Sequence, residues 1–236
     1  TLGLESGVVV KFNNTHHIRV NGILDMQGTS DNPVVFTSWK DDSAGGDTNN
    51  DADTTVPSPG DWYYIDIRNS ENVWKHCEFR YGGYNNGSML SITSSSPTIE
   101  QCTFANARGA AIYVSDGSPQ IKDNVIRESH RGITIYGTSS GTPASRPVIS
   151  GNTITENGLP LSLEGYAFPV FSNNTLTNNA IRSIGVSGSM DPSATRSEIW
   201  PKLDIPYMVN GSFTVGSKMT LGLESGVVVK FNNTHH

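Results

Sequence analysis

The chain has 236 residues and a formal charge of −6, with 22 acidic residues against 16 basic ones and a sequence pI of about 5.4. An acidic balance without any cluster of Lys and Arg argues against nucleic acid and anionic membrane surfaces as main partners. No apolar run approaches the roughly 18 residues of a transmembrane helix, so we expect no membrane insertion. Two cysteines, Cys77 and Cys102, are too few for a disulfide-stapled scaffold, and stability must come from stacking and burial.

The two ends of the chain share one sequence. Residues 1–17, TLGLESGVVVKFNNTHH, recur without a change as residues 220–236, at an offset of 219 residues. Packing requirements alone would not preserve polar positions such as His16 and His17. We therefore predict that residues 1–219 form one repeat unit and that residues 220–236 begin the next identical unit. A duplication introduced artificially into the chain is the alternative.

After the first strands, an acidic insertion at residues 40–61 interrupts the β-rich pattern. Within it, Asp47, Asn49, Asp51 and Asp53 occupy alternate positions, the spacing by which a tight loop turns oxygen atoms toward one hard cation such as Ca²⁺. Together with Asp61, these residues are the predicted metal ligands.

Two departures from a standard calcium loop weaken this interpretation. The sixth loop position is Ala52, where glycine would help a sharp turn, and the twelfth is Ser58, where a bidentate Glu would be expected. Asp61 or Asp42 would then have to supply the missing oxygen. The alternative is a solvated acidic loop in which Gly and Pro merely make turns.

Aromatic residues are concentrated around the insertion and could form a sugar-stacking platform or cover the loop against its neighbours. They are Trp39, Trp62, Tyr63, Tyr64, Trp74, Tyr81 and Tyr84.

Further along the chain, five windows repeat one template. They are VWKHCEF (73–79), SPTIEQCTF (96–104), SPQIKDNVI (118–126), RPVISGNTI (146–154) and FPVFSNNTL (168–176). Their alignment stacks Cys77, Cys102, Asn124, Asn152 and Asn174 in one column, with spacings of 25, 22, 28 and 22 residues. Spacings of this length suit one coil of a solenoid per repeat, because each strand then finds a parallel partner in the next coil.

Two apolar columns accompany this polar one. One lies three residues upstream (Ile99, Ile121, Ile149 and Phe171), and the other lies two residues downstream (Phe79, Phe104, Ile126, Ile154 and Leu176). Such alternation is typical of strands with one buried face. The fold class predicted is therefore all-β, a parallel β-solenoid with about eight or nine coils per unit of 219 residues, or roughly 40 Å of rise per unit.

In this fold, the stacked asparagines can pass hydrogen bonds from coil to coil, since an amide both donates and accepts. Cys77 and Cys102 lie in the same column of neighbouring coils. We expect them to be small, buried, stacked thiols rather than a disulfide, because strands stacked in register rarely give disulfide geometry.

The coil template, the entry segment LGLESGVVVKF followed by VNGILDMQGTSDNPVVFTS, and the insertion ending in PSPGDW together resemble the right-handed parallel β-helix repeats of pectin-lyase-like proteins. The version they resemble occurs in large repetitive bacterial surface and secreted proteins. The resemblance covers nearly the whole chain and implies a right-handed helix and an extracellular or cell-surface location. It says little about function, since the family includes lyases, hydrolases, epimerases, adhesins and inert stalks.

The main functional hypothesis is a structural module that stacks end to end with identical units into an extracellular fibre or surface stalk. We expect no enzyme activity and assign no catalytic residue, because acids outside the insertion are scattered (Glu100, Asp116, Asp123, Glu128, Glu156, Glu164 and Asp191). The alternatives are a polysaccharide-active enzyme (lyase, hydrolase or epimerase) and an adhesin that binds surface glycans or protein through the aromatic and acidic insertion.

Overall fold

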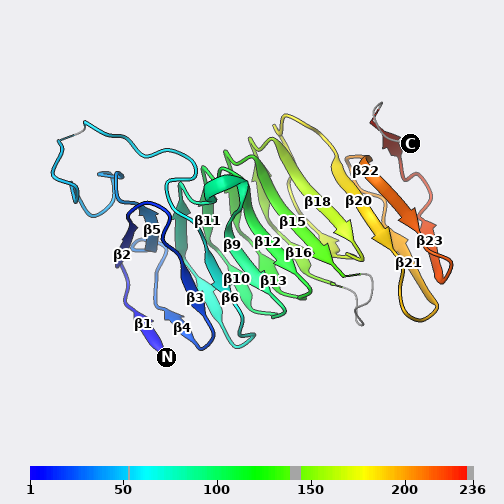
Figure 1. The fold of residues 1–236 in the computed structure, drawn as a ribbon, viewed down its shortest axis with the longest axis horizontal. Helices are drawn as coiled ribbons and strands as arrows, with labels where there is room; N and C mark the ends of the chain where they lie inside the picture. The colour runs from blue at the N-terminus through cyan, green and yellow to red at the C-terminus, as the bar shows by residue number, and fades with distance from the viewer. Residues whose placement is uncertain (53, 139–144, 233–236) are drawn as a thin grey trace.

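In the computed structural model, which describes residues 1–52, 54–138 and 145–232, the strands stack side by side along one long axis (Figure 1). Neighbouring strands pair in parallel and come from successive coils of the chain. The only helical element among the described residues is a short 3-10 helix, η1 (Tyr84–Asn86). In that part of the chain, no helix is long and apolar enough to cross a membrane. The predicted all-β parallel solenoid is confirmed.

Three main sheets form the faces of the solenoid. The nine-stranded sheet contains β3 (Ile18–Val20), β6 (Ile65–Ile67), β9 (Ser88–Thr93), β12 (Ala110–Ser115), β15 (Arg131–Gly137), β18 (Leu159–Gly165), β20 (Ile184–Met190), β22 (Tyr207–Val215) and β24 (Val229–Phe231). The six-stranded sheet contains β2 (Val9–Phe12), β5 (Val34–Ser38), β8 (Cys77–Arg80), β11 (Thr103–Ala105), β14 (Val125–Arg127) and β17 (Thr153–Thr155). The five-stranded sheet contains β7 (Val73–Lys75), β10 (Thr98–Glu100), β13 (Gln120–Lys122), β16 (Val148–Ser150) and β19 (Val170–Ser172).

Two further sheets have two strands each. One joins β1 (Leu2–Leu4) to β4 (Leu24–Met26), and the other joins β21 (Arg196–Trp200) to β23 (Met219–Leu223). A middle coil such as β10–β11–β12 contributes one strand to each of the three main sheets. Within the described part of the first 219 residues, the nine-stranded sheet has eight strands, which agrees with the predicted number of coils.

The core consists of side chains stacked in register from coil to coil. Ile99 pairs with Ile121, and Phe104 pairs with Phe79 and Ile126, as the two apolar columns predicted. The rings of Phe79 and Phe104 lie parallel, with centroids 4.7 Å apart and an interplanar angle of 1°. These side chains are fully buried, so each coil contributes a layer of apolar surface removed from water.

The predicted asparagine ladder is present at the corner between the five-stranded and six-stranded sheets. The backbone N–H of Asn124 donates to Asn152 Oδ1 at 3.0 Å, and that of Asn152 donates to Asn174 Oδ1 at 3.0 Å. At the other end of the ladder, the N–H of Cys102 donates to Asn124 Oδ1 at 2.9 Å. Each corner therefore satisfies its buried backbone donors with a side chain from the next coil.

Below the ladder, Cys77 and Cys102 are buried, free thiols, as predicted. A hydrogen bond to Cys102, together with burial, raises the pKa of the Cys77 thiol far above its ordinary value. Thiols of this kind pack as small apolar groups and are chemically inert.

A second ladder, which the sequence analysis did not predict, runs along the corner between the six-stranded and nine-stranded sheets. The N–H of Ser129 donates to Asn157 Oδ1 at 3.1 Å, and the N–H of Asn157 donates to Asn179 Oδ1 at 2.9 Å. The Oγ of Ser129 accepts the N–H of Ala107 at 3.0 Å and so extends the ladder by one coil.

The third corner, between the nine-stranded and five-stranded sheets, has a serine ladder, in which the N–H groups of Ser96, Ser118 and Arg146 donate to the Oγ atoms of Ser70, Ser96 and Ser118 at 2.8, 3.0 and 3.1 Å. Side chains therefore link successive coils at all three corners.

The C-terminal coils differ from the middle ones because only two sheets continue through them. The six-stranded sheet ends at β17, beyond which Thr153 forms a single bridge to Thr175, and the five-stranded sheet ends at β19. Strands β20 to β24 then alternate between the nine-stranded sheet and the β21–β23 pair. A groove of about 510 Å³, lined by residues 171–177 and 202–205 and by Arg182, opens where the third face stops.

Candidate functional site

The acidic insertion leaves the solenoid at one corner, after β5, and returns before β6. Figure 1 shows it as a long loop that extends away from the stacked strands near the N-terminal end. The flanking strands pair with the next coil in register, Val35 with Glu78 and Asp66 with Ser91, despite the long connection between them. The solenoid therefore presents the loop without being interrupted by it.

The base of the insertion is fastened to the solenoid by Asp41. Its carboxylate accepts hydrogen bonds from Thr37 Oγ1 at 2.5 Å and Ser43 Oγ at 2.5 Å, and Arg80 Nη1 lies 3.4 Å away. Burial alone would raise the pKa of Asp41, but the hydrogen bonds from Ser43 and Thr37 and the charge of Arg80 outweigh it and hold that pKa below its usual range.

Asp61 fastens the other end of the insertion. Its Oδ2 accepts a hydrogen bond from Ser38 Oγ at 2.7 Å and another from the N–H of Ser58 at 3.0 Å, while Lys40 Nζ lies 3.1 Å from its Oδ1. Both oxygens of this predicted ligand are thus engaged in holding the loop closed, and Asp61 is not among the carboxylates that the structure groups together.

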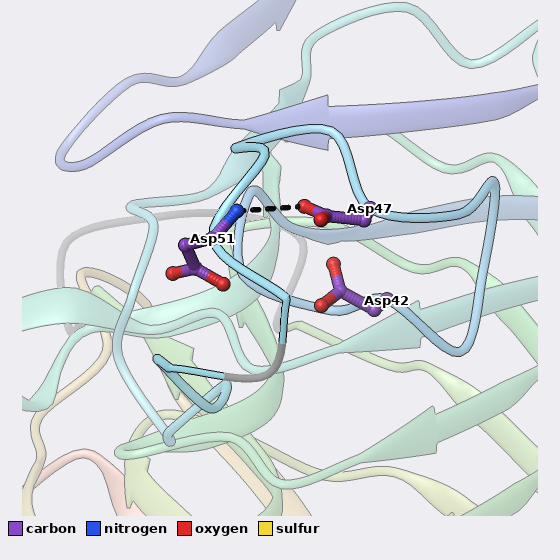
Figure 2. Close-up of side chains that lie close together, drawn as sticks. All are labelled: Asp42, Asp47 and Asp51. Carbon is purple, nitrogen blue, oxygen red and sulfur yellow. Dashed lines mark hydrogen bonds between the residues drawn. The ribbon is translucent and has the colours of Figure 1, made fainter.

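Three carboxylates gather inside the loop: Asp42, Asp47 and Asp51 each place an oxygen within 4.8 Å of the others. Figure 2 shows the three side chains turned toward one another. Asp47 also accepts the N–H groups of Ala52 at 3.0 Å and Asp51 at 3.2 Å. The N–H of Ala52 is the main reason that the pKa of Asp47 is lowered, so this carboxylate stays charged.

Asn49 and Asp51 supply the remaining polar atoms of the cluster. The amide of Asn49 donates to Asp51 Oδ2 at 2.7 Å and to Thr55 Oγ1 at 3.0 Å. The other oxygens of these two side chains, Asn49 Oδ1 and Asp51 Oδ1, are buried and have no hydrogen-bond partner within the described protein. Buried oxygens of this kind normally have a partner.

The structure therefore brings together part of the predicted calcium set. Asp47 and Asp51 lie in the cluster with Asn49 beside them, and Asp53 lies outside the described residues. The third carboxylate is Asp42, which the sequence spacing offered only as a substitute ligand. Oxygens bound to one Ca²⁺ at 2.3–2.6 Å lie at most about 5 Å apart, so the observed separations fit a single ion of this kind.

Of the two roles left open for the aromatic residues beside the insertion, a sugar-stacking platform is excluded for two of them. Trp62 and Trp74 are fully buried. Trp62 stacks on Phe12 with ring centroids 4.4 Å apart, and Trp74 donates its Nε1–H to the carbonyl of Leu24 at 3.0 Å. Their rings fill the core because each lies on an inward-facing position of its coil, and neither can stack against a sugar.

Several charges elsewhere on the solenoid surface lie in local pairs. Glu100 lies 3.2 Å from Lys75 on the neighbouring coil, and Arg127 Nη1 lies 2.6 Å from Glu128. On the nine-stranded sheet, Asp66 contacts both Arg19 and Arg68. The pairs Lys75–Glu100 and Arg19–Asp66 join neighbouring coils, and the other two lie within one coil. All four are interpreted as surface ion pairs.

The family comparison addresses the whole architecture. The family model described as the right handed beta helix region matches residues 3–144 and, in an overlapping match, residues 65–200. The chain belongs to this family. For this β-helix protein, the resemblance inferred from the coil template is confirmed at the level of the fold. No curated protein and no solved structure matches the chain. Because β-helices host enzymes and non-enzymes alike, function has to be argued from particular residues.

Proposed function

We propose that this β-helix is a structural module of a tandem-repeat extracellular fibre or surface stalk, in which identical units stack end to end as one continuous solenoid. The observation that carries the proposal is that the two copies of the terminal segment are buried in a complementary way. At several apolar positions, the side chain that one copy exposes is covered in the other.

Phe12 and Phe231 are the same residue in the two copies. Phe12 is 5% exposed, beneath Phe36 and Trp62, whereas Phe231 is 64% exposed at the C-terminal end. The first leucine of the segment behaves in the opposite way, since Leu2 is 61% exposed and Leu221 is partly buried. In a continuous array one strand would receive both sets of neighbours, and all of these side chains would be covered.

The backbone of the segment also uses opposite edges at the two ends. In the first copy, the N–H of Leu2 and the carbonyl of Leu4 bond to the following coil. In the second copy, the N–H of Glu224 bonds to the preceding coil, and its equivalent in the first copy is Glu5. Alternate residues of a parallel strand bond to alternate sides, so the two sets of bonds are compatible in a single strand.

The test is a series of chains with one, two and three units, made by placing additional copies of residues 1–219 ahead of the full chain. Small-angle scattering and negative-stain microscopy should give a rod of constant width whose length grows by about 40 Å per unit. A compact particle, or separate beads joined by flexible links, would contradict the proposal.

The insertion is proposed to bind Ca²⁺ and so to hold the loop in shape. Support comes from the three gathered carboxylates and from the partnerless buried oxygens of Asn49 and Asp51. Extracellular calcium modules bind with dissociation constants of about 0.1–1 mM, so a weak site would be filled outside the cell.

Calorimetric titration of the chain with Ca²⁺ should show one site, and Asp51→Asn should abolish it. Asp31→Asn, at an exposed carboxylate that accepts a hydrogen bond from Ser30 Oγ, is the matched control and should leave the binding unchanged. Binding that survives Asp51→Asn, or no binding by the parent chain, would refute the calcium site and leave the rod untouched.

A further inference from the structure

We propose that, at each junction, the nine-stranded sheet of one unit continues directly into the six-stranded sheet of the next unit, with the repeated strand shared between them. This inference rests on the proposed end-to-end stacking. It differs from straight stacking, in which each sheet of one unit would continue into the corresponding sheet of the next unit.

The first observation is that the two copies of one strand belong to different sheets. In the first copy, β2 forms the end of the six-stranded sheet and pairs with β5. In the second copy, β24 forms the end of the nine-stranded sheet and pairs with β22. The residues concerned are the same, since Val229, Lys230 and Phe231 repeat Val10, Lys11 and Phe12.

The second observation is that the two pairings use different backbone groups. The carbonyls of Val8 and Phe12 accept hydrogen bonds from β5 and the residue after it. In the second copy, the carbonyl of Val228 and the N–H of Asn232 bond to β22, and these two residues repeat Val9 and Asn13. Even and odd positions of a parallel strand bond to opposite sides, so the shared strand can make both sets at once.

The same side chains of the shared strand point toward the core in both copies. Val229 packs against the core beside Tyr207, and the equivalent Val10 packs against the core in register with Phe36. Buried residues of the two sheets would therefore fall into one inward column, Tyr207 to Val10 to Phe36. A shift by one residue would turn this column outward, which the burial in both copies excludes.

The turn that precedes the shared strand is conserved in geometry between the two copies. The N–H of Val8 donates to the carbonyl of Glu5 at 3.2 Å, and the N–H of Val227 donates to that of Glu224 at 3.1 Å. The segment thus reaches the six-stranded sheet in one setting and the nine-stranded sheet in the other without changing this local turn. The two copies differ in the strand with which this segment pairs, which is β5 in the first copy and β22 in the second.

The end of the six-stranded sheet explains how the exchange can occur. That sheet stops beside the groove lined by residues 171–177 and 202–205, and the coils beyond it keep two sheets only. When the next unit begins, β2 would join the surviving nine-stranded sheet, and β3 would start a new one. Each junction would therefore contain one such groove.

This exchange has a consequence for the surface of the fibre. The insertion always leaves from the corner between the six-stranded and nine-stranded sheets, after β5. Because the nine-stranded face of one unit becomes the six-stranded face of the next, successive insertions would leave from different sides of the rod rather than from one line along it.

Chemical crosslinking in a two-unit chain separates the alternatives. Met208 faces outward and lies in register with Lys230, which is Lys11 of the second unit. With Met208→Cys in the first unit and Lys11→Cys in the second, a short bismaleimide should join the two thiols. Straight stacking would instead bring Met208 of the first unit beside the strand that carries Arg19 in the second unit, and the pair Met208→Cys with Arg19→Cys tests it.

The positive control is Thr98→Cys with Gln120→Cys, a pair in register on neighbouring coils within one unit. We expect the Lys11 pair to crosslink as completely as this control, and the Arg19 pair to crosslink at least tenfold less. Efficient crosslinking of the Arg19 pair would overturn the sheet exchange while leaving the proposed rod in place. Crosslinking at neither junction pair, with the control pair joined, would overturn both.

Discussion

Replacing Phe12 with alanine should destabilise the chain far more than replacing Phe231, although the two residues occupy the same position of an identical sequence. Phe12 stacks on the buried ring of Trp62, while Phe231 is 64% exposed. Because the residues around Phe12 and Phe231 are identical, the comparison of the two variants isolates the effect of the neighbouring coil.

The magnitudes follow from burial. Truncation of a buried phenylalanine to alanine costs about 3–5 kcal/mol, because the lost transfer free energy is added to that of the cavity left behind. Only about a third of the Phe231 side chain is covered, and a third of the roughly 1.5–3 kcal/mol for full burial gives about 1 kcal/mol or less.

Equilibrium unfolding in urea, followed by circular dichroism, measures both losses. In a two-unit chain, the phenylalanine at the junction acquires the next unit's Phe36 and Trp62 as neighbours, and its truncation should then cost as much as that of Phe12. Equal losses for Phe12→Ala and Phe231→Ala in the present chain, or no increase at the junction, would refute the reasoning.

Asn152→Ala should cost about 2–4 kcal/mol in the same assay, because it leaves the buried N–H of Asn124 and the buried carbonyl of Ile121 without partners. Asn174→Ala removes the equivalent bonds to Asn152 and Ile149, but Asn174 is only half-buried, so water can replace them and the cost should be about 1 kcal/mol. Since the pKa of Asp41 is lower in the folded chain than in the unfolded one, its contribution to stability is present above the unfolded pKa and is lost as the pH falls through the folded pKa. Urea midpoints at about pH 7 and about pH 3 should therefore diverge less for Asp41→Asn than for the parent chain. Gly117→Ala should destabilise the chain, because its added Cβ would lie 2.1 Å from the carbonyl oxygen of Ser95; an unchanged urea midpoint would show that this corner can relax.

The coils were predictable because a β-solenoid repeats the same environment at the same position of every turn. Alignment on Asn124, Asn152 and Asn174 was enough to find the first ladder and both apolar columns. The second ladder had a signal of the same kind, since Asn157 and Asn179 each lie five residues after a ladder asparagine. It was missed because the windows were aligned on one column only.

The burial of Trp74 could also have been predicted from the upstream apolar column. Trp74 lies three residues before Cys77, in the position that isoleucine occupies in later coils, and the structure pairs it with Ile99. The prediction instead grouped the aromatic residues by nearness to the insertion. Position within a coil, rather than position along the chain, decides which side chains face inward.

The insertion was less predictable because no repeat constrains it. Alternate spacing placed Asp47 and Asp51 together, but it could not show that Asp42 folds back to join them. Nor could it show that Asp61 is bound by Ser38 and Lys40. These outcomes depend on where the loop's two ends leave the solenoid, which is a property of the three-dimensional corner.

The corner that carries the insertion also bears on how such a protein can diversify. Closing a loop about six times longer than the tight corners elsewhere costs only about 1.5 kcal/mol, because the entropic cost grows with the logarithm of length. Strands on either side keep their partners, Val34 with Cys77 and Ile65 with Leu90, although this long loop connects them. We therefore expect that the loop at this corner can be replaced, in evolution or by design, while the strand pairing of the coils is retained.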